Sequence, residues 1–186
     1  MQNLKLLLVM LSLVLVASCS SVSVSDYEGR QPVLDPRVFF DGKICADGVV
    51  RDRAGRQIRQ FNAQILATWD EQGIGTLDEI FEFDDGTETR IWTLTPTPKG
   101  AYRASASDVP EETTMRYAGN VIHMSYLLRY GEPGDTIDLN MDDWMFQVAD
   151  GVVINETVMT KFGLRVGQVL LVMRQVTDDY NCLPGK

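Results

Sequence analysis

The chain has 186 residues, 45% of them hydrophobic, and its 26 acidic side chains outnumber the 17 basic ones, which gives a formal net charge of −9. An acidic surface argues against nucleic acid as a partner and against electrostatic docking on anionic lipid. The length suits a single domain with a sizeable core.

The start of the chain has the layout of an export signal. Residues 1–18 hold one charged side chain, Lys5, which is followed by the apolar blocks Leu6–Leu11 and Leu13–Ala17. These blocks are shorter than the roughly 20 apolar residues that a membrane-spanning helix needs, and Ser12 interrupts them. We therefore predict a signal peptide over residues 1–18 and not a permanent membrane helix.

The end of this signal, Val16–Cys19, resembles the lipobox of bacterial lipoproteins, in which the cysteine is acylated and the chain is cut just before it. The resemblance implies a lipid attached to Cys19, and Ser20 in place of an aspartate implies sorting to the outer membrane. The alternative is an ordinary signal peptide with a cysteine nearby. If the signal is removed, Lys5 is lost and the net charge goes from −9 to −10, so acyl chains and not charge would hold the protein at the membrane. Ser20–Ser25 would then be a flexible tether.

Two cysteines remain if Cys19 is acylated. Cys45 and Cys182 are a candidate disulfide pair in an oxidising compartment. Closing so long a loop is worth roughly 5 kcal/mol in the chain-entropy model. The alternative is two separate thiols, one packed in the core and one on a loose C-terminal tail.

From Ile44 onward the chain alternates between strands and turns. In Arg56–Trp69 every second residue from Phe61 to Trp69 is apolar, as in a strand with one buried face, and Asp85-Gly86 is typical of a hairpin turn. Further strands are predicted at residues 101–107, 113–118, 121–130, 136–146, 152–160 and 168–176.

This pattern predicts an all-β fold, an antiparallel up-and-down β-barrel of eight to ten strands, with a β-sandwich as the alternative. Charged residues on the outward faces, such as Asp78, Arg103 and Glu156, argue against strands that face lipid. The predicted organisation is a signal peptide at 1–18, a lipidated N-terminus, tether and lead-in at 19–43, a barrel at 44–177 and a C-terminal tail at 178–186.

Several short motifs lie along the mature chain: FFDG at Phe39–Gly42, RDRAG at Arg51–Gly55, FDDG at Phe83–Gly86, DDWM at Asp142–Met145 and MTKFG at Met159–Gly163. Together with the lipobox, this set resembles a family of uncharacterised Gram-negative lipoproteins, a domain of unknown function with a lipocalin-like β-barrel. The resemblance implies a fold and a location, the periplasmic face of the outer membrane. It implies no activity, so it transfers no site residues.

Catalytic and metal-binding motifs are not found. The one histidine, His123, lies on the more polar face of its predicted strand, and the chain has no Gly-x-Ser-x-Gly elbow and no Cys-x-x-Cys pair. Asp138, Asn140 and Asp142 begin like a calcium loop, but Asp143 stands where the turn glycine is required. We therefore predict no enzyme, no catalytic residue, no metal site and no cofactor.

A barrel of about eight strands is either filled by its side chains or holds one small ligand. The large residues expected near such a cavity, each of which could instead be core, are Trp69, Phe81, Phe83, Trp92, Met124, Tyr126 and Trp144. Arg90 and Arg116 could meet an anionic headgroup or could be paired and solvated. The sequence favours a membrane-tethered protein that binds a lipid or another small hydrophobic ligand. The alternative is a structural or interaction lipoprotein with a solid barrel that contacts an envelope partner.

Overall fold

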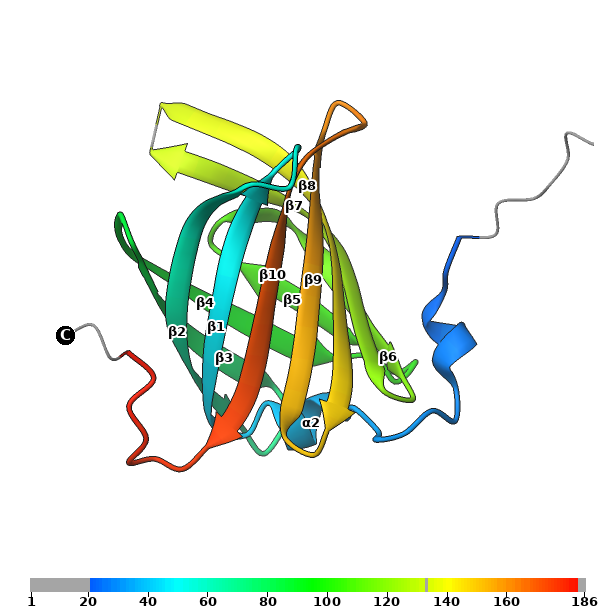
Figure 1. The fold of residues 1–186 in the computed structure, drawn as a ribbon. Coiled ribbons are helices and arrows are strands. Elements are labelled where there is room, and N and C mark those ends of the chain that lie inside the picture. The colour runs from blue at the N-terminus through cyan, green and yellow to red at the C-terminus, as the bar shows by residue number, and fades with distance from the viewer. Residues whose placement is uncertain (1–20, 133, 184–186) are drawn as a thin grey trace, which may run out of the picture.

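The computed structural model describes residues 21–132 and 134–183. They form a closed barrel of ten strands in which each strand pairs with its chain neighbours and β1 pairs with β10 (Figure 1). The strands are β1 (Gly42–Asp52), β2 (Gln57–Trp69), β3 (Gly75–Phe83), β4 (Gly86–Pro96), β5 (Tyr102–Ala106), β6 (Val109–Ala118), β7 (Val121–Glu132), β8 (Asp135–Ala149), β9 (Val152–Lys161) and β10 (Leu164–Val176). The predicted antiparallel up-and-down barrel is confirmed, at the upper end of the expected number of strands.

Alternation of apolar and polar residues decides which side of each strand faces the interior. In β2, Phe61, Ala63, Ile65 and Ala67 are buried, while the residues between them are exposed or half-buried. The seam between β1 and β10 runs in continuous antiparallel register from the pair Lys43–Val176 to the pair Asp52–Gly167. Because this seam closes the sheet, neither of the two strands presents an unpaired edge.

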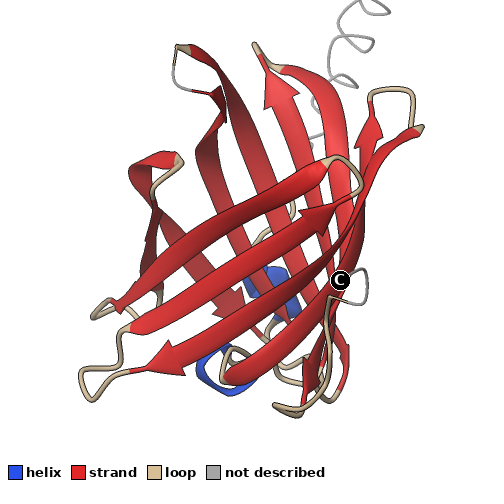
Figure 2. Cartoon of the chain, turned by 90° about the vertical axis from the view of Figure 1, so that its left-hand side faces the viewer, coloured by secondary structure: helices blue, strands red, loops and turns tan. Residues whose placement is uncertain are grey.

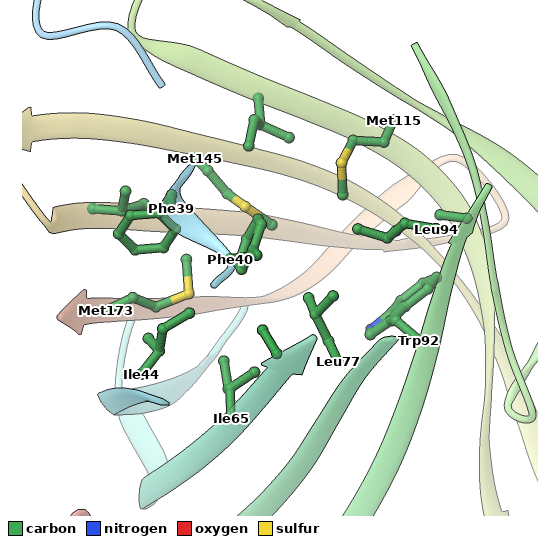
Figure 3. Packing of buried hydrophobic residues seen from close by; sticks show 14 of the residues in the cluster. Phe39, Phe40, Ile44, Ile65, Leu77, Trp92, Leu94, Met115, Met145 and Met173 are labelled. Carbon is green, nitrogen blue, oxygen red and sulfur yellow. The ribbon is translucent and has the colours of Figure 1, made fainter. Parts of the chain in front are cut away.

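A short helix, α2 (Pro36–Phe39), closes one end of the barrel, the lower end in Figure 1. The Asp35 side chain caps it by accepting a hydrogen bond from the Arg37 backbone N–H at 2.8 Å. Phe39 and the following Phe40 are buried, and Figure 3 shows both rings among core side chains such as Met145 and Met173. The end is therefore plugged by aromatic rings.

The segment before α2 packs on the outside of the barrel. Its single turn of 3-10 helix, η1 (Val24–Tyr27), is capped by Ser23, so the last residues of the predicted tether belong to a docked helical turn. The Tyr27 ring packs against Trp144 and Phe146 with centroids 5.9 and 6.0 Å away. The predicted signal peptide at 1–18 and the lipid-attachment site at Cys19 lie outside the described residues.

The C-terminal tail is tied back to β1. Cys45 and Cys182 form a disulfide, with Cα atoms 5.1 Å apart. The Lys43 ammonium also donates to the backbone oxygens of Asp178 and Tyr180, at 3.0 and 2.7 Å. Within the described part of the chain, every helix is too short to span a bilayer.

Candidate ligand-binding cavity

A cavity of about 370 Å³ lies inside the barrel. Phe40, next to α2, forms its floor, and Ile58, Tyr130 and Ile137 line its other end. These three residues are exposed, so the cavity opens at the end opposite α2, where Figures 1 and 2 show hairpin turns. The volume is within the range of small-molecule sites in proteins.

Most of the wall is apolar and much of it is flexible. Six methionines contribute to it: Met115, Met124, Met141, Met145, Met159 and Met173. Methionine has an unbranched, polarisable side chain that adapts to irregular shapes. The wall therefore suits an apolar molecule and can adjust to its outline.

Five of the seven residues predicted to lie near a cavity line this one: Phe81, Phe83, Trp92, Met124 and Tyr126. Two predictions are corrected. Trp69 packs against the core without lining the cavity, and its indole N–H donates to the Phe40 backbone oxygen at 2.5 Å. Trp144 lies on the outer face, because Asp143 and Met145 on either side of it are the buried positions of β8.

A polar cluster interrupts the apolar wall. Glu79 on β3 pairs in register with Arg90 on β4, and both side chains line the cavity. Arg90 donates from Nε and Nη2 to one oxygen of Asp108, at 2.8 and 2.7 Å. Asp108 lies in the turn between β5 and β6, so this ion pair joins β4 to that turn.

The second part of the polar cluster comes from β8 and β9. Asp143 is buried and accepts hydrogen bonds at its Oδ1 atom from Asn155 and from Thr157, the latter at 2.9 Å. Asn155 also donates to the Trp144 backbone oxygen at 3.0 Å. These bonds fix the orientation of a carboxyl group between two methionines of the wall.

Burial changes the proton affinity of these groups. Desolvation raises the pKa of Glu79 to about 7, with the charges of Asp108 and Asp143 adding to the effect and Arg90 opposing it. Desolvation likewise raises the pKa of Asp143, although the hydrogen bonds from Asn155 and Thr157 oppose it. Burial also holds the pKa of the Tyr126 hydroxyl well above its usual value, so this group stays protonated and can donate a hydrogen bond.

The mouth of the cavity carries a second ionic network around Arg59. Its guanidinium contacts Asp85 at 2.5 Å and Glu88 at 3.0 Å, and it donates to the Tyr130 hydroxyl at 3.2 Å. It also lies 3.6 Å from the centroid of the Phe83 ring. Because Tyr130 belongs to β7 and Arg59 to β2, the network crosses the mouth between distant strands.

Other residues considered from the sequence lie outside the cavity. His123 faces outward, where its Nε2 atom is 2.7 Å from Asp142 and its ring lies 4.2 Å from that of Trp144. Arg116, a candidate for binding an anionic headgroup, is exposed, whereas Arg90, the other candidate, does line the cavity and is paired with Asp108. Among the described residues, no group of three or more histidines, cysteines or acidic side chains is placed to hold a metal ion.

Glu79, Asp143 and Asn155 are among the polar wall residues that sequence reasoning missed. Each was a polar residue on a strand, the type that usually faces water. The available signal was their position between apolar neighbours: Glu79 alternates with Leu77 and Phe81, and Asp143 alternates with Met141 and Met145. A polar side chain in the middle of a buried face indicates an interior polar site.

Comparison with known proteins finds solved structures with a similar fold and a matching protein family. In one solved structure, a protein of unknown function from the DUF3598 family of Nostoc punctiforme, the match has a TM-score of 0.56 at 13% identity and covers 79% of this chain and 51% of that one. The chain thus spans about half the length of that protein. The S-type phycobiliprotein lyase CPES from Guillardia theta matches with a TM-score of 0.50 at 8% identity, over 77% of this chain and 90% of the lyase.

At these identities the two structures show a shared fold alone. No curated protein matches the chain. The family model described as "Protein of unknown function (DUF3833)" matches residues 13–175, which is most of the chain. The protein therefore belongs to the DUF3833 family.

Proposed function

We propose that this protein is a lipid-anchored binding protein that holds one small hydrophobic molecule inside its barrel. Its anchor would be an acylated Cys19, and its location the periplasmic face of the outer membrane. The observation that carries the proposal is the cavity of about 370 Å³, plugged at the α2 end and open at the other. A molecule held there would exchange its contact with water for contact with methionine and aromatic side chains.

The cavity favours this function over a purely structural barrel. A solid barrel would fill its interior with side chains, whereas this one keeps space for a ligand above Phe40. We propose binding and not catalysis, because the described residues that line the cavity include no histidine, serine, cysteine or lysine beside the carboxyl groups. The phycobiliprotein lyase shares only the fold at 8% identity, so its activity is not carried over.

Binding of the neutral apolar dye N-phenylnaphthylamine tests the proposal. Dye fluorescence should rise on addition of the purified protein. Val169→Trp places a large ring in the cavity wall and should weaken binding at least about tenfold, or about 1.4 kcal/mol. Leu170→Trp is the matched control, since this neighbour on β10 is not among the cavity-lining residues and should leave the affinity unchanged. Equal affinities of the two variants, or no binding at all, would contradict an interior site.

A further inference from the structure

The charged groups of the cavity wall are unbalanced. The wall carries two arginines and four acidic residues: Arg59, Arg90, Glu79, Glu88, Asp108 and Asp143. Both guanidinium groups are already engaged, since Arg90 is bonded to Asp108 and Arg59 to Asp85 and Glu88. A ligand that enters therefore meets carboxyl groups in excess of cations.

Several acceptor atoms of this wall are unused. Glu79 is only 8% exposed, and the guanidinium of Arg90, whose charge acts on it, donates its hydrogen bonds to Asp108 instead. The Oδ1 atom of Asp108 is buried without a hydrogen-bond partner among the described residues. At Asp143 both donors reach the same oxygen, Oδ1. Buried acceptors without donors are costly, so such a site is stabilised by a ligand that brings N–H groups.

We propose that the cavity selects a lipophilic amine, whose apolar chain lies along the methionine and aromatic wall and whose ammonium group donates to Glu79 and Asp143. This inference rests on the proposed function, because it names the ligand class of the same cavity. An ammonium group offers three donors and a positive charge, which matches the unused acceptors. A fatty acid of equal length would bring a further carboxylate to a wall whose arginines are already paired, and like charges brought together oppose binding.

Three ligands of ten carbon atoms each differ in their headgroup: decylamine, decanol and decanoate. Comparing them separates the effect of the headgroup from that of the alkyl chain. Their affinities for the whole protein are measured by isothermal titration calorimetry at pH 8, above the pKa of about 7 of Glu79, and below the concentrations at which they form micelles. We expect decylamine to bind at least about tenfold more tightly than decanoate, with decanol between them. Equal affinities, or tighter binding of decanoate, would overturn the inference and leave the proposed binding function intact. If no ligand binds and the neutral dye also fails to bind, the proposed function fails as well.

The double variant Glu79→Gln, Asp143→Asn tests whether these two carboxyl groups set the preference. This double variant should reduce the ratio of the decylamine affinity to the decanoate affinity by at least about tenfold. Its affinity for decanol should stay close to that of wild type. The matched control is Asp78→Asn, Asp142→Asn, which removes the neighbouring exposed carboxyl groups on the outer faces of the same strands and should keep the ratio. An unchanged ratio in the cavity variant would overturn the assignment. The wild-type comparison decides the ligand class even if the double variant does not fold.

Discussion

Glu79 is an ionisable side chain inside a mostly apolar barrel, and it illustrates how one residue couples stability to pH. Its neighbours along the strand, Leu77 and Phe81, face the same cavity. Removing the carboxyl group from water disfavours its charged form, which raises its pKa to about 7. The folded protein therefore holds a proton that the unfolded chain releases near pH 4.5, the ordinary value.

The proton held by Glu79 decides whether the free energy of unfolding rises or falls with pH. Between pH 4.5 and about 7 the folded state binds more protons than the unfolded state, so the contribution of Glu79 to the free energy of unfolding falls as pH rises. The glutamine of Glu79→Gln does not titrate, so this variant does not lose stability at this position as pH rises. Relative to wild type, its free energy of unfolding should rise by up to about 3 kcal/mol between pH 4 and pH 8.

Urea denaturation of both proteins across this pH range measures the effect. Asp78→Asn, on the exposed side of the same strand, is the control and should show a difference from wild type that varies little with pH. A difference between Glu79→Gln and wild type that stays constant from pH 4 to pH 8 would contradict a buried Glu79 with a raised pKa.

At the scale of residues, the sequence predicted side-chain direction well where alternation was unbroken. It placed Phe81 and Phe83 near a cavity, and the structure has both on the cavity wall. It failed at Trp144 because aromatic size was given more weight than position in the strand, whose inward residues there are Asp143 and Met145. Size indicates burial only when the alternation agrees.

At the scale of elements, the ten strands were predictable and the plug was not. Strands follow from alternation over many residues and from the glycine turns between them. By contrast, α2 has four residues, too few for a helical period to be visible. Phe39 and Phe40 were noted only as a motif in the lead-in segment, yet both rings close the end of the barrel and Phe40 forms the floor of the cavity.

The turn between β6 and β7 positions the N-terminal segment on the outer wall. Gly119 has φ +53°, and a Cβ atom there would lie 1.8 Å from the Tyr27 backbone oxygen. Its own oxygen accepts a hydrogen bond from the Leu34 N–H at 2.8 Å. Gly119→Ala should therefore displace the segment that carries η1.

Limited proteolysis tests this displacement, with faster cleavage expected between Ser21 and Leu34 in Gly119→Ala than in wild type. Gly100→Ala is the control, because Gly100 also has a positive φ of +71° but no atom within 4 Å of the added Cβ. Equal cleavage of the two variants would show that backbone strain alone, and not the contact with Tyr27, accounts for the change.

The disulfide joins the beginning of β1 to the C-terminal tail. Cys45 and Cys182 are separated by 137 residues, so the bond restrains the unfolded chain strongly. Cys182→Ala should lower the free energy of unfolding by about 2–5 kcal/mol. Denaturant unfolding measures this loss, and wild type treated with a reductant should behave as the variant does. A variant as stable as the untreated wild type would contradict the stabilising role of the bond.

At the scale of the whole molecule, attachment and binding are separate properties. The proposed anchor at Cys19 precedes the first described residue, and the cavity is lined by residues from Phe40 onward. Cys19→Ala should therefore release the protein from membranes into a soluble or uncleaved form. Fractionation followed by mass measurement of the N-terminus tests this, and an unchanged lipidated membrane fraction would contradict the anchor.

The sequence alone could not predict that the members of the polar cluster meet inside the barrel. Glu79, Arg90 and Asp143 come from strands β3, β4 and β8, and only closure of the barrel brings them to one interior. Alternation predicts the face that a residue occupies, but register and closure decide which residues meet across the cavity. The sequence therefore predicted a hollow or filled barrel without distinguishing the two.

The central claim is that the barrel carries a small hydrophobic molecule, and native mass spectrometry of protein purified from its own membrane tests it most directly. We predict a stoichiometric adduct that dissociates on denaturation and is absent or reduced in Val169→Trp, while Leu170→Trp retains it. A clean mass without any adduct, together with no binding of N-phenylnaphthylamine, would contradict the claim.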